Sequence, residues 1–506
     1  MNLKRLMPLA VVGVLSAATT VGTMHYLDNN NNNNQDFSYF HSSNKDAQFA
    51  SLNTSAVGDD FVKAAKIAVP AVVTVKNYQK RAGRTQNMDQ DLFDFFFGNP
   101  FGNGQRNQGQ PQVPDGLPSG LGSGVIISPD GYIITNNHVV EHATKLEVQL
   151  SNKKTYTATL VGTDPSTDIA LLKVEEKGLP YLNFANSDLA EVGQWVLAIG
   201  NPLGMTSTVT SGIISAKGRS IDLLREKSRT PIESFIQTDA VINRGNSGGA
   251  LVNTNGDLVG INSAISSTTG YYQGYGFAVP SNLARKVVED IKKFGIVQRA
   301  FLGTSNIDLS DEAVVKQYNL RNKANLKPGV GMYIVEVADN SGAKDAGLKS
   351  GDIIKKVDGQ NITDFADLSL AIGRKRPGDS VSVTFLRDGK EITKNVVLKD
   401  QMGNTKYRSK AELSVKEKLG ADFVTLNERQ KVYFGINNGV GVVNIAEDGL
   451  LASIQMNNEN IIIEINGKPV NSQKDIEKIL DGYKGQVNVK YLDENGRLTS
   501  RGFKMP

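Results

Sequence analysis

The sequence contains no cysteine and only four histidines among its 506 residues. Without a thiol, the chain can form no disulfide, zinc ribbon or iron–sulfur cluster, and it has no cysteine nucleophile. The histidines are His25, His41, His138 and His142. A mechanism that needs a histidine base therefore has few places to put it.

A charge excess and a phosphate-binding loop are also missing. The 56 basic side chains nearly balance the 52 acidic ones, whereas a dedicated nucleic-acid binder would carry a concentrated basic excess. No glycine-rich loop of the Walker type occurs, which argues against use of ATP. We therefore expect no nucleic-acid partner and no cofactor.

The chain is, in contrast, long and rich in glycine. The 506 residues are about three times the length of a typical domain, so several domains are expected. The 50 glycines favour turn-rich β structure over long helices.

The first residues resemble a bacterial secretion signal. Lys4 and Arg5 precede an apolar run over residues 6–24, which is the usual order of regions in such a signal. The run is nearly long enough to span a bilayer and shows no clean cleavage motif. Residues 1–27 are therefore either a removed signal peptide or a membrane anchor, and in both cases the bulk of the chain is exported. Residues 28–60 form a polar leader.

Residues 61–295 contain many short β-rich runs separated by turns. Turn signals such as Pro129-Asp130-Gly131 recur between the runs, a pattern that predicts an all-β barrel or sandwich, and the length fits two barrels. The runs with the strongest β character are residues 71–75, 124–127, 132–134, 170–174, 195–199 and 258–261.

A long insertion over residues 78–118 interrupts this region. It is rich in Gly, Asn, Gln and Pro, and its aromatic side chains are Phe93, Phe95, Phe96, Phe97 and Phe101. A loop of this length in a compact domain is commonly functional or disordered. So many aromatic side chains also need a partner surface, so we expect a regulatory loop.

A helix and an internal repeat follow. An apolar stripe predicts a helix at residues 281–294, with Ser281 as its N-cap and Gly295 as its end. Residues 329–398 and 439–506 then share a glycine-leucine turn, a helical stretch and a closing pair of strands. This indicates a repeat of roughly 100 residues.

The stretch 245–249, Gly-Asn-Ser-Gly-Gly, is the most informative in the chain. Its glycines permit a sharp turn that exposes the Ser247 hydroxyl and aims backbone N–H groups at a developing oxyanion. The alternative for this stretch alone is an ordinary glycine-rich hairpin turn. A nucleophilic serine also requires a nearby base, which a third group must orient.

One histidine and one aspartate fit these two roles. His25 and His41 lie in the leader, whereas His138 directly follows the predicted strand at residues 132–134. Asp168 opens another apolar strand, so its carboxylate can point into the same site. The resulting order, His, Asp, Ser, is that of chymotrypsin-type enzymes.

The same histidine also belongs to a metal-binding pattern. Residues 138–142 match H-x-x-E-H, in which His138 and His142 would share one face of a long helix and ligate zinc. The chain turns instead into an alternating strand soon after residue 144, so we expect His142 on the surface and no metal site.

Three motifs together carry a resemblance. Residues 135–140 (Thr-Asn-Asn-His-Val-Val), 167–174 (Thr-Asp-Ile-Ala-Leu-Leu-Lys-Val) and 243–252 (Asn-Arg-Gly-Asn-Ser-Gly-Gly-Ala-Leu-Val) precede the two repeats. In this order they resemble the HtrA/Deg family of serine endoproteases, closest to its periplasmic DegP/DegQ type with two PDZ domains. The likeness covers nearly everything after residue 61.

The resemblance implies a mainly β fold. A chymotrypsin-like double β-barrel protease domain would occupy residues 61–295, followed by α+β PDZ domains at 299–400 and 410–506. It implies His138 as general base, Asp168 as its orienter and Ser247 as nucleophile. Gly245 and Ser247 would supply the amides of the oxyanion hole.

The resemblance also implies partners and regulation. The expected activity is ATP-independent degradation, with chaperoning, of unfolded proteins in the periplasm, by homotrimers and larger homo-oligomers. The 78–118 loop would reach into a neighbouring subunit's site in the resting state. A pocket beside Ile242 and Ile265 would favour small apolar side chains.

The repeats are expected to bind peptide C-termini. Phe301, Leu302 and Gly303 would form a carboxylate-binding loop beside a strand edge. In the second repeat, residues 432–436 (Val-Tyr-Phe-Gly-Ile) are expected at the matching place. Residues 456–460 depart from the first repeat's 349–352, so peptide binding and a role in assembly both stay open there.

Two further expectations complete this reading of the sequence. Asn246 stands where digestive relatives have Asp, and a neutral amide cannot pair with a new N-terminal ammonium, so activation should come from loop rearrangement. The competing function is a non-proteolytic PDZ scaffold with a dormant barrel, against which the intact His138, Asp168 and Ser247 set argues.

Overall fold

The computed structural model describes residues 57–79, 118–201, 207–224, 228, 230–243, 245–265, 274–445 and 449–505. The predicted secretion signal, most of the predicted polar leader and the aromatic side chains of the 78–118 insertion lie outside the described residues. Of the helices in the described ranges, none combines the length and apolar character needed to cross a bilayer.

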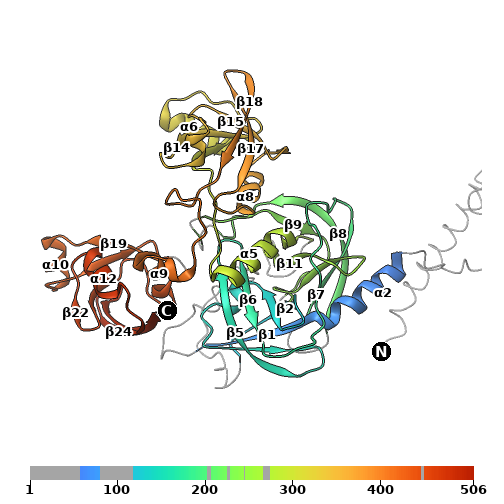
Figure 1. Ribbon diagram of the computed structural model, residues 1–506, viewed down its shortest axis with the longest axis horizontal. Coiled ribbons are helices and arrows are strands. Elements are labelled where there is room, and N and C mark those ends of the chain that lie inside the picture. The colour runs from blue at the N-terminus through green and yellow to red at the C-terminus, as the bar shows by residue number, and fades with distance from the viewer. Residues whose placement is uncertain are drawn as a thin grey trace, which may run out of the picture. The chain divides into compact units, whose positions relative to one another are not determined.

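Two closed six-stranded barrels form the first part of the described chain (Figure 1), which confirms the predicted double barrel. In the first barrel the strand order is β1-β2-β3-β6-β5-β4. Its strands are β1 (Val72–Tyr78), β2 (Gly120–Ile126), β3 (Tyr132–Thr135), β4 (Lys145–Gln149), β5 (Thr155–Asp164) and β6 (Ile169–Lys173). The 78–118 insertion therefore joins two hydrogen-bonded neighbours, β1 and β2.

The second barrel repeats the closure with the order β10-β11-β12-β9-β8-β7. Its strands are β7 (Trp195–Gly200), β8 (Thr208–Arg219), β9 (Phe235–Thr238), β10 (Ala250–Asn253), β11 (Leu258–Ile265) and β12 (Gly276–Pro280). Buried aliphatic side chains of both barrels join in one core. The short β-rich runs that the sequence pattern predicted thus lie in the strands of these barrels.

Within the described residues, three helices accompany the barrels: α2 (Val57–Ala68), α4 (Asn137–Val140) and α5 (Ser281–Phe294), with a 3₁₀ turn at Val69–Ala71 after α2. Helix α5 packs against β5 and β6 of the first barrel and β11 and β12 of the second (Figure 1). The helix prediction is confirmed, including its end at Gly295, which has a φ of 77°. The N-cap prediction is wrong by one residue, because Pro280 caps the helix and the Ser281 hydroxyl donates to the Ala185 carbonyl.

A five-stranded sheet with a short extra strand follows, in the order β13-β14-β15-β17-β18, with β16 on β15. Its elements are β13 (Thr304–Asp308), α6 (Glu312–Asn322), β14 (Met332–Val337), α7 (Gly342–Asp345), β15 (Ile353–Val357), β16 (Gln360–Asn361), α8 (Phe365–Gly373), β17 (Ser380–Arg387) and β18 (Lys390–Val397). Strand β13 lies at the edge of this sheet, and the helices enclose a separate apolar core.

The last part of the chain has the same topology, with the order β19-β20-β21-β23-β24 and β22 on β21. Its elements are a 3₁₀ turn (Lys410–Glu412), α9 (Val415–Leu419), β19 (Asp422–Thr425), α10 (Glu428–Phe434), β20 (Val440–Val443), α11 (Leu450–Ser453), β21 (Ile461–Ile465), β22 (Lys468–Pro469), α12 (Gln473–Leu480), β23 (Gly485–Leu492) and β24 (Leu498–Met505). The shared strand order confirms the internal repeat.

Candidate active site

Asp168 lies just before β6 in an unusual backbone conformation. Its φ is 57°, in the left-handed region that few residues other than glycine adopt. Two donors hold its carbonyl oxygen: the side-chain amide of Asn136 at 2.9 Å and the backbone N–H of Asn137 at 3.1 Å. This pinned backbone aims the buried carboxylate at α4.

That carboxylate contacts His138, which lies on the short helix α4. Its Nδ1 lies 3.0 Å from Asp168 Oδ1 and 2.9 Å from Oδ2, and its backbone N–H donates to Oδ1 at 3.0 Å. The carboxylate keeps the proton on Nδ1, so the lone pair of the neutral ring resides on Nε2. Nε2 is therefore the atom that can accept a proton from a substrate or nucleophile.

Ser247 reaches this pair through a residue that the sequence analysis missed. The Ser247 hydroxyl donates to the backbone carbonyl of Ser263 at 3.0 Å. The Ser263 hydroxyl donates in turn to Asp168 Oδ2 at 2.8 Å. Ser263 belongs to β11 and carries no motif, so only the closure of the second barrel brings it to the site.

The turn around Ser247 has the geometry of an anion-binding loop. Gly245 and Gly248 have φ values of 94° and 83°, which residues with a Cβ rarely adopt. The amides of Asn246, Gly248 and Gly249 donate to backbone carbonyls. Within the described ranges, the N–H groups of Gly245 and Ser247 have no such backbone acceptor, which leaves them available to an oxyanion.

Asn246 packs inward at this turn. It is buried, and a Cβ placed on Gly200 would lie only 2.3 Å from its Oδ1. A close fit against the end of β7 thus holds this neutral side chain in the interior.

The predicted specificity residues lie beside the turn. Ile242 is fully buried, and a Cβ on Gly276 would lie 2.9 Å from its Cδ1. Ile265 ends β11 with its backbone paired to Gly276, while its side chain lies outside the described residues. The loops at 202–206 and 266–273 also lie outside them.

The geometry excludes the helical metal site that the H-x-x-E-H pattern suggested. Helix α4 has four residues and ends at Val140, and exposed His142 follows it with a left-handed φ of 55°. His138 and His142 therefore do not share a helix face, as that motif requires.

Comparison with known proteins agrees with this geometry. Residues 122–261 match the model of the trypsin-like peptidase domain, and residues 300–398 match that of the PDZ domain. A probable periplasmic serine endoprotease, DegP-like, from Marinomonas sp. (strain MWYL1) is 39% identical over 443 residues, which cover 85% of this chain and 90% of the relative. The chain belongs to the DegP-like periplasmic serine endoproteases.

Two further proteins are similar to this chain. The periplasmic serine endoprotease DegP of Escherichia coli (strain K12) is 36% identical over 82% of this chain and 85% of its own. Among solved structures, the HtrA-type protease AlgW with a tripeptide aligns with 67% of this chain and 96% of its own at 35% identity and a TM-score of 0.48.

The DegP-like protein is thus a periplasmic serine endopeptidase with PDZ domains, and the expectation of a non-proteolytic scaffold is not favoured. Its first PDZ domain places Phe301, Leu302 and Gly303 immediately before the edge strand β13. Leu302 is buried, and Gly303 has a φ of 82°. The Phe301 N–H already donates to the Lys399 carbonyl at 2.8 Å. The N–H groups of Leu302 and Gly303 are therefore the ones left for a peptide carboxylate.

The second PDZ domain corrects one sequence prediction. Residues 432–434 lie in α10, after β19, and so match α6 of the first PDZ domain instead of its carboxylate-binding loop. Leu419 and Gly420 take the place of Leu302 and Gly303, because they precede the edge strand β19, with only Ala421 between Gly420 and the strand. The Gly420 amide donates to the Lys416 carbonyl at the end of α9, so a peptide cannot use it without uncapping that helix.

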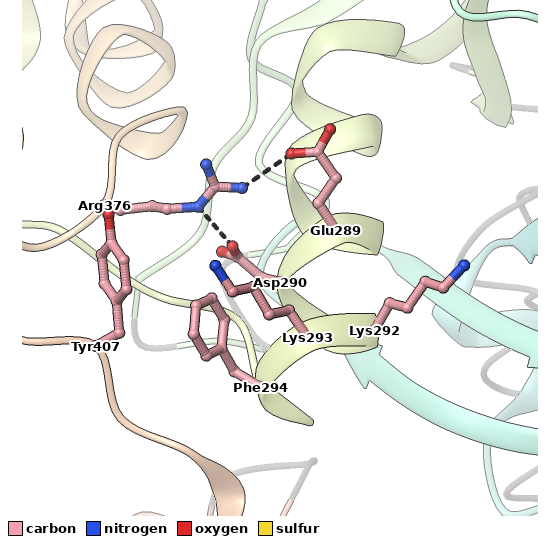
Figure 2. Close-up of a pocket in the computed structure, with 7 residues that line it drawn as sticks. All are labelled: Glu289, Asp290, Lys292, Lys293, Phe294, Arg376 and Tyr407. Carbon is pink, nitrogen blue, oxygen red and sulfur yellow. Dashed lines mark hydrogen bonds and ion pairs between the residues drawn. The ribbon is translucent and has the colours of Figure 1, made fainter.

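A pocket beside helix α5 is separate from these sites (Figure 2). Arg376, just after α8, donates to Asp290 at 2.6 Å and to Glu289 at 3.1 Å across it. Phe294 and Tyr407 line it with their rings 5.2 Å apart. No predicted catalytic or peptide-binding residue lines this pocket.

Proposed function

We propose that this DegP-like endoprotease cleaves unfolded periplasmic proteins without ATP, by attack of Ser247 on the scissile carbonyl. The observation that carries the proposal is the chain of hydrogen bonds from His138 through Asp168 and Ser263 to Ser247. A base held in one tautomer beside a nucleophile on a glycine-rich turn is the arrangement that acyl transfer needs.

The reaction begins with proton transfer within this group. Rotation of the Ser247 hydroxyl away from the Ser263 carbonyl brings its proton to His138 Nε2 as the oxygen attacks. The imidazolium that forms is stabilised by the buried Asp168 carboxylate, and it later gives its proton to the leaving amine. The amides of Gly245 and Ser247 stabilise the tetrahedral oxyanion.

We expect the substrate preference to follow from Ile242, which lies beside the predicted specificity pocket. The Ile242 side chain fills the space in front of Gly276. A bulky substrate side chain would clash there, so the enzyme favours small apolar residues at the cleavage site.

The first PDZ domain captures substrate C-termini. An edge strand offers backbone groups for one more strand, and the amides of Leu302 and Gly303 cap the terminal carboxylate. In the second PDZ domain, use of the Gly420 amide by α9 favours a role in assembly over peptide binding.

The protein assembles as a homotrimer and in larger oligomers. Trp195 is 44% exposed, and Leu189 and Val192, on the preceding segment, are 77% and 63% exposed. Apolar side chains that project in this way are common at protein interfaces. The chain divisions at 61–295, 299–400 and 410–506 remain our proposal. So do a removed or anchoring segment at 1–27 and regulation by the 78–118 loop, which lies largely outside the described residues.

Replacement of the nucleophile tests the proposal. Ser247→Ala should abolish cleavage of an unfolded casein-like protein while the protein still folds, because one hydroxyl is lost. Ser281→Ala, which removes a buried serine hydroxyl from α5, is the matched control and should keep full activity. The assay is gel-resolved substrate turnover without nucleotide, and cleavage retained by Ser247→Ala would refute the assignment.

A further inference from the structure

Ser123 is the point at which strand β2 meets the catalytic turn. It is fully buried, and its backbone N–H donates to the Ser247 carbonyl at 2.8 Å. Its hydroxyl donates to the Gly245 carbonyl at 2.6 Å and accepts from the Asn201 N–H at 2.8 Å. Its carbonyl accepts the Thr135 hydroxyl, three residues before His138, at 2.6 Å. Ser123 therefore contacts both barrels, and in the second barrel it contacts Ser247 and Gly245, which lies just before it.

The direction of the Ser123 hydroxyl proton is fixed by its partners. A serine hydroxyl has one proton to donate. The Asn201 N–H is itself a donor, so it can only approach a lone pair of the oxygen. The proton is thereby committed to the Gly245 carbonyl, and the hydroxyl cannot turn elsewhere without leaving two buried backbone groups unsatisfied.

Gly245 needs such a restraint. Its φ of 94° is open to glycine, and glycine has more backbone freedom than any other residue. A small rotation at Gly245 would swing its N–H away from a developing oxyanion. Glycine has no side chain, so no side-chain contact can hold Gly245 against the barrel core.

We propose that Ser123 is a positioning residue for the oxyanion hole, whose hydroxyl holds the Gly245 carbonyl so that the Gly245 N–H faces the reacting carbonyl. This inference rests on the catalytic roles proposed above for Ser247 and Gly245. Ser123 acts through Gly245 and does not touch the substrate.

A neighbouring hydroxyl provides a matched control. Thr74 on β1 is also fully buried, and its hydroxyl donates to the carbonyl of the same Asn201 at 2.9 Å. Loss of either hydroxyl removes a buried hydrogen bond to Asn201, but the Ser123 hydroxyl also donates to Gly245 in the catalytic turn. The Thr74→Val replacement keeps the shape of the side chain.

The experiment compares full-length wild type, Ser123→Ala, Thr74→Val and Ser247→Ala with a short chromogenic peptide. Loss of a direct oxyanion donor costs roughly 10²–10³ in kcat, so loss of the group that positions one should cost about 10- to 100-fold in kcat. KM should stay near the wild-type value in Ser123→Ala. Binding of a peptide aldehyde, whose adduct with Ser247 places an oxyanion in the hole, should weaken by a similar factor, while binding of the product peptide should not.

Each outcome decides one point. Equal kcat in Ser123→Ala and wild type, or equal losses in Ser123→Ala and Thr74→Val, would overturn the positioning role and leave a purely structural hydroxyl. If Ser123→Ala does not fold, as judged by Trp195 fluorescence, Ser123→Cys takes its place, because the thiol is a weaker donor. Wild-type cleavage that Ser247→Ala retains would instead refute the catalytic assignment itself.

Discussion

At the scale of single residues, Asp168 shows that the polar groups of this site form hydrogen bonds with one another. Its carbonyl takes two donors and its carboxylate takes the imidazole, a backbone N–H and the Ser263 hydroxyl. A buried carboxylate is costly unless such donors compensate it. The same donors therefore stabilise the charge and fix its direction toward His138.

Ser263 gives the residue-scale prediction. The Ser263→Ala variant loses the donor to Asp168 but keeps the backbone carbonyl that accepts from Ser247. A hydrogen bond to a charged group is worth about 1.5–3 kcal/mol, so kcat should fall by roughly 10-fold or more, with little change in KM. Steady-state peptide hydrolysis measures both constants.

The control is Ser281→Ala, which removes the hydroxyl that a buried serine of α5 donates to the Ala185 carbonyl. Its kcat should equal that of wild type. If Ser263→Ala also matched wild type, the contact with the carboxylate would have no catalytic role.

At the scale of secondary-structure elements, function depends on the edge strands β13 and β19. In both repeats a glycine with positive φ precedes the edge strand: Gly303 comes directly before β13, and Gly420 is separated from β19 by one residue, Ala421. The two entrances differ in one element: α9 precedes β19 and uses the glycine amide as its last hydrogen bond. The same fold can thus offer a carboxylate cradle in one copy and a closed helix end in the other.

The element-scale prediction concerns peptide C-termini. Peptides with a free apolar C-terminus should bind full-length Ser247→Ala protein, which cannot cleave them, and amidation should weaken binding at least several-fold. The cause is loss of charge-assisted hydrogen bonds to the amides of Leu302 and Gly303. Fluorescence anisotropy with paired acid and amide peptides measures the ratio.

Deletion of residues 410–506 serves as the control for that measurement. The acid-over-amide preference should survive it, because the first PDZ domain supplies the cradle. Equal affinity for the two peptide forms in the full chain would contradict the proposed loop.

A buried charge network on α5 acts at the scale of the whole molecule. Lys286 and Asp290 form an almost fully buried ion pair at 3.0 Å, and Asp290 also accepts from Arg376 (Figure 2) and from the Gln298 backbone. Helix α5, which packs against both barrels, thereby also bonds to the segment that leads into the first PDZ domain and to Arg376 after α8. Burial, followed by the nearby Arg299 guanidinium, lowers the pKa of Lys286 to about 8 from 10.5.

This lowered pKa predicts a pH-dependent stability. Between pH 8 and 10.5 the unfolded chain binds more protons at Lys286 than the folded chain, so the free energy of unfolding rises with pH in that window. The wild type should therefore gain stability relative to Lys286→Met above pH 8, while the difference stays constant below it. Thermal unfolding followed by Trp195 fluorescence measures it, and a difference that falls above pH 8 would refute the sign.

Much of this architecture was set by local sequence. The short aliphatic runs predicted strands that the barrels contain, the stripe at 281–294 predicted α5, and the repeat predicted two sheets of one topology. His138, Asp168 and Ser247 stood out because each lies in a motif at a strand end or a glycine turn. These are short-range properties of the chain, so the sequence alone carries them.

Local pattern misled the analysis where two copies diverged. Residues 432–436 looked like a carboxylate-binding loop because aromatic residues precede a glycine, yet they form and follow α10. Glu459 and Asn460 occupy the turn that Gly351 and Asp352 make in the first repeat, with Glu459 at a φ of 73°. The order of strands, rather than residue identity, aligns the copies.

The partners of the catalytic residues were decided by tertiary structure alone. Ser123 and Gly245 are 122 positions apart, and Ser263 and Asp168 are 95 apart. Neither serine has a sequence signature, because a lone serine in a strand is ordinary. They become neighbours of the active site only when each barrel closes and β2 meets the catalytic turn. The sequence by itself thus determined the fold class and singled out the three side chains that we propose for catalysis, whereas barrel closure determined which hydroxyls lie around them, since hydrogen bonds depend on distances in space.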